Sequence, residues 1–451
     1  MTSKEESSEI YKGLSALRRQ FSTPPSSPSS SLSGETPILS PASRQLHNDP
    51  PVILDIGARG IRAGIAGMEL PACEILVQPD FRNRIQVYQL WSRNIEETNM
   101  EDFHDILQTL LRDVYYKYLL LDGKSRKVII LESAFMSIKL KQAITFVLFN
   151  YFQSISVTFL QSSICALFSA GARSGLIVDI GWHETVIVPI FDYRPLFHFV
   201  QTSNRAGKYL HDLISDEIRA VTGVQSTVPE LEEFIYRSTY CDSHTSASTT
   251  TEAAPQSAFA IRLSGTDYYV PSYQTRERPI IETFIQRAAD CVDDNDTFPI
   301  PDLIISILSK VGIDVRSSLM PRIIFTGGCS NIPGLKLRIV NEVRDILTGA
   351  SPSLEKQKNF SPWLIRERSS IKAIQSLGAW SGASLYIQQE RDYMINGNGN
   401  ARRVRVETTG GVSHIASSSF RIPGEIEREK FLLDSNYATN ILDWTIPVKY
   451  D

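Results

Sequence analysis

The chain has 451 residues, 42% of them hydrophobic, and its 46 basic and 50 acidic side chains leave a formal net charge of −4. This balance argues against a globally basic nucleic-acid-binding protein. No apolar run approaches the ~20 residues of a membrane span, and the N-terminus lacks the apolar core of a secretory signal. Five scattered cysteines without a C-x-x-C pair argue against a disulfide scaffold or a zinc site. They are Cys73, Cys165, Cys241, Cys291 and Cys329.

The first 50 residues differ in composition from the rest of the chain. Residues 1–50 are rich in serine and proline and poor in large apolar side chains. Such a segment buries too little surface to offset its ordering entropy, so we expect a disordered tail. Two further stretches, 241–257 and 395–419, carry many turn-forming residues and are expected to be surface loops.

The remaining sequence alternates strand-like and helix-like patterns. In chain order these are a strand at Val52–Asp55, a helix capped by Asn99, a strand at Lys127–Leu131, helices at 143–152 and 161–170, a strand at Leu176–Asp179, and a helix around Leu210–Ile218. In the helix after Asn99, the apolar residues Phe103, Ile106, Leu107, Leu110, Leu111, Val114 and Tyr118 fall on one face. Alternation of strands with helices predicts α/β layers.

One strand pattern occurs twice. Val52–Gly57 and Leu176–Gly181 are both apolar strands that end in Asp-Ile-Gly, and each continues into a second apolar strand, at 61–66 and 185–190. A repeated unit predicts a duplicated fold with two related halves. Backbone N–H groups in such a turn are able to bind phosphate, and an Asp at a strand end is able to hold magnesium. Two ordinary hairpins with Asp and Gly as turn formers are the alternative.

A third element favours the phosphate interpretation. Arg322–Thr326 is a strand that runs into Gly327 and Gly328, followed by Pro333 and a helix over Leu335–Leu347. Paired glycines after a strand let a flat ligand approach the backbone closely. The small residues of Ser376–Leu385 predict a helix packed tightly on a neighbour.

Taken in order, these segments resemble the actin family. Val52–Gly67 is similar to the first phosphate loop, Gly175–Ile190 to the second, Pro321–Leu335 to the adenosine motif, Ser376–Leu385 to the helix after it, and Ala416–Leu433 to the C-terminal region. The resemblance implies an α/β, actin-like fold of duplicated ribonuclease H-like lobes flanking a nucleotide cleft. The lobes are expected at 51–185 and 186–385, and residues 386–451 are expected to form an inserted loop and a segment that returns to the first lobe.

The resemblance also implies ligands and their sites. ATP or ADP with magnesium is implied as a structural ligand, held by Asp55, Gly57, Arg62, Asp179, Gly181, Gly327 and Gly328, with Asp55 and Asp179 toward the metal. Several positions depart from the family pattern, because Ala58 and Arg59 replace Ser and Gly, Trp182 and His183 replace Asp and Gly, and Ala143 stands at the position matched to a water-positioning Gln. Arg62 replaces a phosphate-contacting Lys, which keeps the charge and changes the geometry. We therefore expect weak or absent ATP hydrolysis and no catalytic residue.

One stretch is much shorter than in actins. Gln78–Thr98 stands where the family builds subdomain two, whose surface belongs to the pointed end of a subunit. A reduced subdomain two implies a subunit that joins a filament's pointed end and stops growth there.

The subgroup with these features comprises the actin-related proteins that cap the pointed end of dynactin's actin-like filament, and the ending IPGEIEREKF also resembles that subgroup. The implied function is a non-polymerising structural subunit in the cytoplasm and cytoskeleton. Its implied partners are the filament and other pointed-end subunits and, indirectly, dynein and microtubules, with no direct nucleic-acid contact and no membrane insertion. One alternative is a nuclear actin-related subunit of a chromatin-remodelling complex, although the longest basic cluster is Arg402-Arg403-Val404-Arg405. The other is an active ATPase of the superfamily.

Overall fold

The computed structural model describes residues 49–78, 88–124, 126–242, 258–287, 297–348, 362–395 and 424–433. The expected tail and the two expected loops lie almost entirely outside these ranges. The chain divides into two compact units, which we call unit 1 (residues 1–169 and 379–451) and unit 2 (residues 170–378).

Unit 1 is built on a six-stranded mixed sheet with the order β14-β5-β4-β1-β2-β3. Its strands are β1 (Val52–Ile56), β2 (Gly60–Ile65), β3 (Cys73–Leu76), β4 (Lys127–Glu132), β5 (Ser156–Gln161) and β14 (Ile426–Glu427). β1, β4 and β5 run parallel, whereas β2, β3 and β14 are antiparallel to their neighbours. The short strand β14 brings the C-terminal segment back to unit 1.

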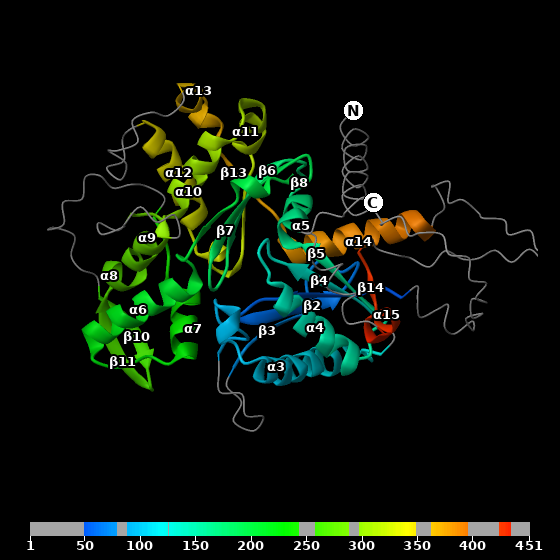
Figure 1. Cartoon of the computed structure of the whole chain (residues 1–451). Helices are drawn as coiled ribbons and strands as arrows, with labels where there is room; N and C mark the ends of the chain where they lie inside the picture. Colours follow the sequence, from blue (N-terminus) through cyan, green and yellow to red (C-terminus); the bar gives the residue numbers. More distant parts are fainter. Residues whose placement is uncertain are drawn as a thin grey trace, which may run out of the picture. The chain divides into compact units, whose positions relative to one another are not determined.

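Helices cover both faces of this sheet (Figure 1). They are η1 (Ile95–Glu97), α3 (Met100–Asp113), η2 (Val114–Leu119), α4 (Ile138–Asn150), α5 (Ser162–Ser169), α14 (Ala379–Ile395) and α15 (Arg428–Leu433). The Asn99 side chain caps α3 by accepting from the Glu101 N–H at 3.0 Å. The apolar face predicted for α3 packs against α4 and the sheet, from Phe103 through Leu111.

The small-residue helix predicted near Ser376–Leu385 is present as α14, which begins at Ala379. A Cβ at Gly382 would lie 1.9 Å from the carbonyl oxygen of Cys165, so only glycine allows α14 to pack this closely on α5. The Trp380 indole donates to the carbonyl oxygen of Ile53 at 3.1 Å and ties α14 to β1.

Unit 2 is built on a second mixed sheet with the order β13-β12-β6-β7-β8, in which β9 also pairs with β7. Its strands are β6 (Gly175–Ile180), β7 (Thr185–Phe191), β8 (Arg194–Pro195), β9 (Gln201–Ser203), β12 (Ile323–Thr326) and β13 (Ala373–Ile374). A separate hairpin consists of β10 (Ala258–Leu263) and β11 (Thr266–Pro271).

The helices of unit 2 enclose a large apolar core around these strands. They are η3 (Phe197–Phe199), α6 (Gly207–Thr222), α7 (Val228–Ser238), α8 (Ser272–Arg276), α9 (Arg278–Phe284), α10 (Ile300–Lys310), α11 (Ile313–Leu319), η5 (Gly328–Asn331), α12 (Leu335–Thr348), α13 (Pro362–Arg366) and η7 (Glu367–Ser370). Within the described residues, no helix has the length and apolar character of a membrane span.

The two sheets repeat one arrangement, which confirms the predicted α/β fold with related halves. In unit 1, β1 forms a hairpin with β2 and runs parallel to β4. In unit 2, β6 forms a hairpin with β7 and runs parallel to β12. Each unit therefore presents a hairpin turn at the carboxyl end of a parallel strand, where open α/β sheets place their ligands.

Candidate functional site: two equivalent strand-end turns

The two Asp-Ile-Gly segments form the same turn. The Gly57 N–H donates to the carbonyl oxygen of Gly60 at 2.9 Å, and the Gly181 N–H donates to that of Glu184 at 3.0 Å. Each bond closes a two-residue connection, which is Ala58-Arg59 in unit 1 and Trp182-His183 in unit 2. Four of the positions that depart from the family pattern, Ala58, Arg59, Trp182 and His183, are therefore the central residues of the two turns.

Asp55 precedes the first turn and is held by a neighbouring arginine. In the β1–β2 register Asp55 lies opposite Arg62, whose Nη1 is 3.4 Å from the Asp55 carboxylate. Burial raises the pKa of Asp55 above its usual value, while the Arg62 charge acts in the opposite direction. Arg62 also donates from Nε to Glu74 at 3.0 Å. Two of the predicted unit 1 residues are thus brought together, and Arg62 is shared between two carboxylates.

Three further polar side chains gather at the same edge of the unit 1 sheet, and none of them was predicted from the sequence. Glu132 and Gln161 end the parallel strands β4 and β5 and are paired in register. Glu132 forms an ion pair with Lys141 of α4 at 2.5 Å, with both side chains buried. Burial raises the pKa of Glu132 above its usual value, and Lys141 opposes the shift. The predicted strand ended at Leu131, and Gln161 was assigned to a predicted helix at 161–170, whereas the structure ends β4 at Glu132 and β5 at Gln161.

Gln161 corrects the expectation placed on Ala143. The Ala143 side chain is buried in the unit 1 core, so its position faces the interior and offers no place for a water-positioning group. Gln161 instead lies at the carboxyl edge of the sheet, and its buried Oε1 has no hydrogen-bond partner among the described residues. A buried amide oxygen without a partner is costly, which points to a ligand or a water at this edge. The alanine at position 143 is therefore no longer an argument for weak ATP hydrolysis.

In unit 2 the predicted residues Asp179 and Gly327 meet directly. Gly327 has φ +87°, and a Cβ there would lie 2.3 Å from the carbonyl oxygen of Ile180 and 2.7 Å from Asp179 Oδ1. Only glycine lets the strand β12 end this close to the second turn. Gly328 has open space around its Cα, and the η5 turn that it begins places Ser330 Oγ as a donor to the Gly327 carbonyl at 2.8 Å.

Trp182 fills the second turn with an aromatic ring. The ring packs edge-to-face on His211 of α6 with a centroid distance of 5.5 Å. The first N–H groups of α6 are also engaged here, because Gly207 donates to the Gly181 carbonyl at 2.9 Å and Lys208 donates to the Trp182 carbonyl at 2.8 Å. Free N–H groups at a helix start are a typical anion site. In unit 2, the N–H groups of Gly207 and Lys208 are instead hydrogen-bonded to carbonyls of the turn.

The residues at the two turns suit the magnesium ion of a bound nucleotide better than they suit its phosphates. Asp55 in unit 1 and Asp179 in unit 2 each supply a single carboxylate at an equivalent strand end, and magnesium is usually bound by one or two carboxylates while it keeps several waters. Among the described residues there is no group of three or more His, Cys, Asp or Glu that would hold a metal by themselves. Gly57, Gly181 and Gly327 permit close backbone approach, whereas Arg59 and Trp182 bring bulk to the turns. Phosphates are expected to have fewer backbone donors here than in a glycine-lined loop.

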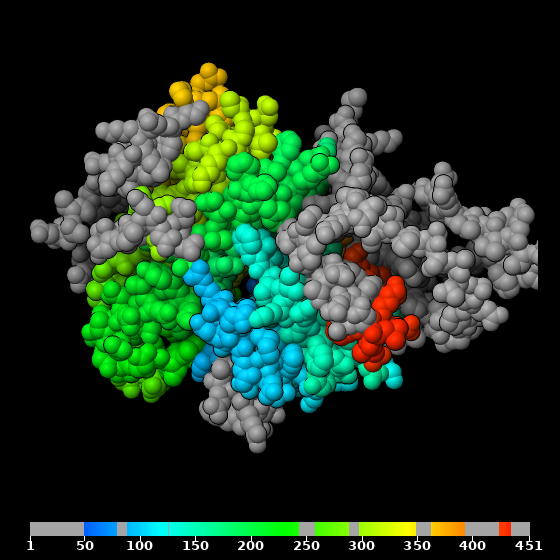
Figure 2. Space-filling view, in the orientation of Figure 1, coloured from blue at the N-terminus to red at the C-terminus, as the bar shows by residue number. Residues whose placement is uncertain are grey.

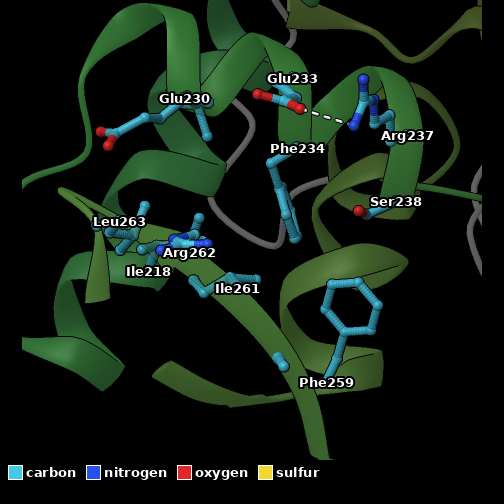
Figure 3. Close-up of a pocket in the computed structure, with 13 residues that line it drawn as sticks. Ile218, Glu230, Glu233, Phe234, Arg237, Ser238, Phe259, Ile261, Arg262 and Leu263 are labelled. Carbon is cyan, nitrogen blue, oxygen red and sulfur yellow. Dashed lines mark ion pairs between the residues drawn. The ribbon is translucent and has the colours of Figure 1, made fainter. Parts of the chain in front are cut away.

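A surface groove of about 380 Å³ lies elsewhere in unit 2, between α7 and the β10–β11 hairpin (Figure 3). Phe234 of α7 and Phe259 of β10 both line it and pack edge-to-face, with 6.2 Å between ring centroids. Glu233 and Arg237 form an ion pair at its rim. None of the predicted site residues lines this groove, so the strand-end turns remain the candidate site.

Comparison with known proteins agrees with this architecture. A family model described as "Actin" matches residues 47–232 and 267–391, and the chain therefore belongs to the actin family. The actin-like protein ARP10 of Saccharomyces cerevisiae is 32% identical over 122 residues, which are 27% of this chain and 41% of that protein.

Two other relatives align over longer stretches. The actin-like protein arp10 of Schizosaccharomyces pombe is 24% identical over 299 residues, covering 59% of this chain and 73% of that protein. Actin-related protein 2 of Saccharomyces cerevisiae is 24% identical over 338 residues, covering 66% and 82%.

Proposed function

We propose that this protein is a non-polymerising actin-related subunit that caps the pointed end of the actin-like filament of dynactin and so supports dynein-based transport on microtubules. One observation carries the proposal. β3 ends at Leu76 and α3 begins at Met100, and the described residues between them contain only the short turn η1. Val77 and Leu90 both hydrogen-bond to the first turn. Residues 78–89 are then too few for the subdomain that offers a next subunit its interface.

The similarity to two proteins named actin-like protein ARP10 supports the same proposal. The proposed location is the cytoplasm and cytoskeleton, and the proposed partners are the filament and the other pointed-end subunits. Direct contact with nucleic acid or insertion into a membrane is not part of the proposal.

A filament-end assay tests the capping role. Purified protein at a small fraction of the subunit concentration is expected to slow subunit loss from pointed ends and leave barbed ends unaffected. The protein alone is expected to stay in the supernatant under polymerising conditions. Filament formation by the protein alone, or equal effects at both ends, contradicts the proposal.

Affinity purification with protein identification separates the alternatives. Recovery of dynactin subunits supports the capping subunit. Recovery of chromatin-remodelling subunits without dynactin subunits supports the nuclear alternative and contradicts the proposal.

We further propose that nucleotide, if bound, serves as a structural ligand and is hydrolysed slowly or not at all. Trp182 in the second turn and the loss of glycine at Arg59 support this, whereas Gln161 at the strand edge supplies a polar group that a hydrolytic site would use. Phosphate release is measured at saturating MgATP. Turnover comparable to that of polymerising actin contradicts the proposal, and any residual turnover is expected to fall in Gln161→Leu.

A further inference from the structure

Arg59 is a buried cation at the centre of the first turn, where the actin family has glycine. Only 8% of the residue is exposed. Its Nη1 donates to the carbonyl oxygen of Val77 and to that of Tyr88, the latter at 2.5 Å. The guanidinium also lies over the Tyr88 ring, 5.6 Å from its centroid. One side chain therefore contacts both ends of the segment that replaces subdomain two.

The backbone of the same turn holds these two ends as well. The Val77 N–H donates to the Arg59 carbonyl at 2.9 Å, and the Leu90 N–H donates to the Ala58 carbonyl at 2.7 Å. Leu90 is buried in the unit 1 core. The side chain and the backbone thus make four hydrogen bonds from one two-residue turn to residues on either side of 78–87.

Charge and burial make these contacts mutually dependent. A buried guanidinium is costly unless its N–H groups are paired, and hydrogen bonds from an ionised donor are about twice as strong as neutral ones. The carbonyls of Val77 and Tyr88 supply that pairing only when both ends of the segment lie against the turn. A glycine at this position would leave those carbonyls without the cation.

We propose that Arg59 is a positioning residue, which acts as a clamp that holds Val77 and the stretch from Tyr88 to Leu90 against the first turn. The largely exposed stretch that follows, from Arg93 to Glu97, lies in the light-blue region of Figure 2. The replacement of the loop glycine by Arg59 and the shortening of subdomain two are then structurally coupled. As a consequence, the Arg59 side chain in the first turn is hydrogen-bonded to carbonyls of the chain itself. The importance of the clamp for capping rests on the proposed function, whereas the clamp itself does not.

Hydrogen exchange on the full chain tests the clamp, because the Val77 and Leu90 amides report on it directly. In Arg59→Ala these amides are expected to exchange at least about tenfold faster. This factor corresponds to the stability lost when a hydrogen bond to a charged group is removed. Amides of β4 are expected to change less than twofold. Arg59→Lys keeps the charge but replaces the planar guanidinium with an ammonium group, so an intermediate rate is expected.

Arg62→Ala is the matched control, because Arg62 lies three residues away and contacts Asp55 and Glu74. In Arg62→Ala, the exchange rate of the Leu90 amide is expected to stay within twofold of the wild-type rate. Unchanged exchange at Val77 and Leu90 in Arg59→Ala overturns the clamp. If Arg59→Ala fails to fold, Arg59→Lys decides: faster exchange confined to the two reporter amides supports the clamp, and equal acceleration across the unit 1 sheet or no acceleration overturns it.

A capping assay on the same variants separates the two proposals. If the wild type caps pointed ends, Arg59→Lys is expected to cap more weakly. If the wild type does not cap, the proposed function fails while the exchange result still decides the clamp.

Discussion

At the scale of single residues, the two adjacent glycines of unit 2 have different roles. Gly327 has φ +87° and no room for a Cβ beside the Ile180 carbonyl, whereas a Cβ placed on Gly328 would have no atom within 4 Å. Gly327→Ala is expected to lower the free energy of unfolding by about 2–4 kcal/mol, through backbone strain and overpacking. Urea unfolding followed by circular dichroism measures the change.

Gly328→Ala is the control for that substitution and is expected to change the free energy of unfolding by less than about 1 kcal/mol. Equal losses in the two variants would show that the close approach of Gly327 to the second turn is not what fixes this position.

A second residue, Asp302 at the start of α10, is expected to make stability depend on pH. Burial raises the pKa of Asp302 to about 6, with Arg287 and Arg205 opposing the shift and Glu342 adding to it. Its buried Oδ2 has no hydrogen-bond partner in the part of the chain that the structure describes. Between pH ~4 and ~6 the folded chain holds a proton that the unfolded chain releases, so this group makes the protein less stable as pH rises through that window.

Asp302→Asn removes the titration. Relative to the wild type, the variant is expected to be about 1–2 kcal/mol more stable at pH 7.5 than at pH 5. Urea unfolding at the two pH values measures this difference. A pH-independent difference between Asp302→Asn and the wild type would contradict the assignment.

At the scale of elements, the sequence predicted what is local and missed what depends on tertiary structure. The capped helix after Asn99 is confirmed, but the predicted apolar face continued to Tyr118, whose side chain is 51% exposed. The chain widens into the π-helix η2 at Val114–Leu119, which changes the number of residues per turn and turns Tyr115 inward instead. The prediction used a constant 3.6 residues per turn, so it did not anticipate the π-helix.

The candidate site shows the same limit. Asp55 and Asp179 were found because a six-residue pattern repeats, and repetition is visible in a single sequence. Gln161 and Glu132 were not found, since one polar residue at a strand end is ordinary until the parallel pairing of β4 with β5 places the two side by side. The contact from Arg59 to Tyr88 spans 29 positions, and nothing in the local sequence indicates it.

The carboxylate of Glu230 links the hairpin β10–β11 to α7. Glu230 accepts from the Thr227 N–H at 2.9 Å, which caps the helix, and from the Ser264 N–H in the hairpin turn at 2.6 Å. These hydrogen bonds, led by that from Ser264, lower the pKa of Glu230 below its usual value. Glu230→Ala is expected to cost about 1–2 kcal/mol, as for the loss of a helix cap.

Thermal unfolding measures that loss, and Glu233→Ala on the same helix is the control. Glu233 forms an exposed ion pair with Arg237, worth about 0.3–0.5 kcal/mol. If the two variants melt at the same temperature, Glu230 does not link the hairpin to α7.

At the scale of the whole molecule, each unit carries one of the two carboxylates predicted on the metal side of a nucleotide. Asp55 lies in unit 1 and Asp179 in unit 2. A ligand that binds only the folded chain stabilises it by about 2.7 kcal/mol at one hundred times its dissociation constant. Saturating MgATP is therefore expected to raise the melting temperature of the wild type by a few degrees.

Asp55→Asn and Asp179→Asn are both expected to lose this ligand-induced rise, because each removes one of the two carboxylates predicted to hold the magnesium. The asparagine side chain keeps the shape of the carboxylate, so the melting temperature without nucleotide is expected to stay near that of the wild type, and Asp267→Asn on the β10–β11 hairpin is expected to keep the full rise. A rise that survives Asp179→Asn but not Asp55→Asn would mean that unit 1 alone holds the ligand. A rise that survives both would mean that the repeated turns are structural hairpins, and that Trp182 and Arg59 mark a chain that has kept the duplicated fold without its nucleotide site.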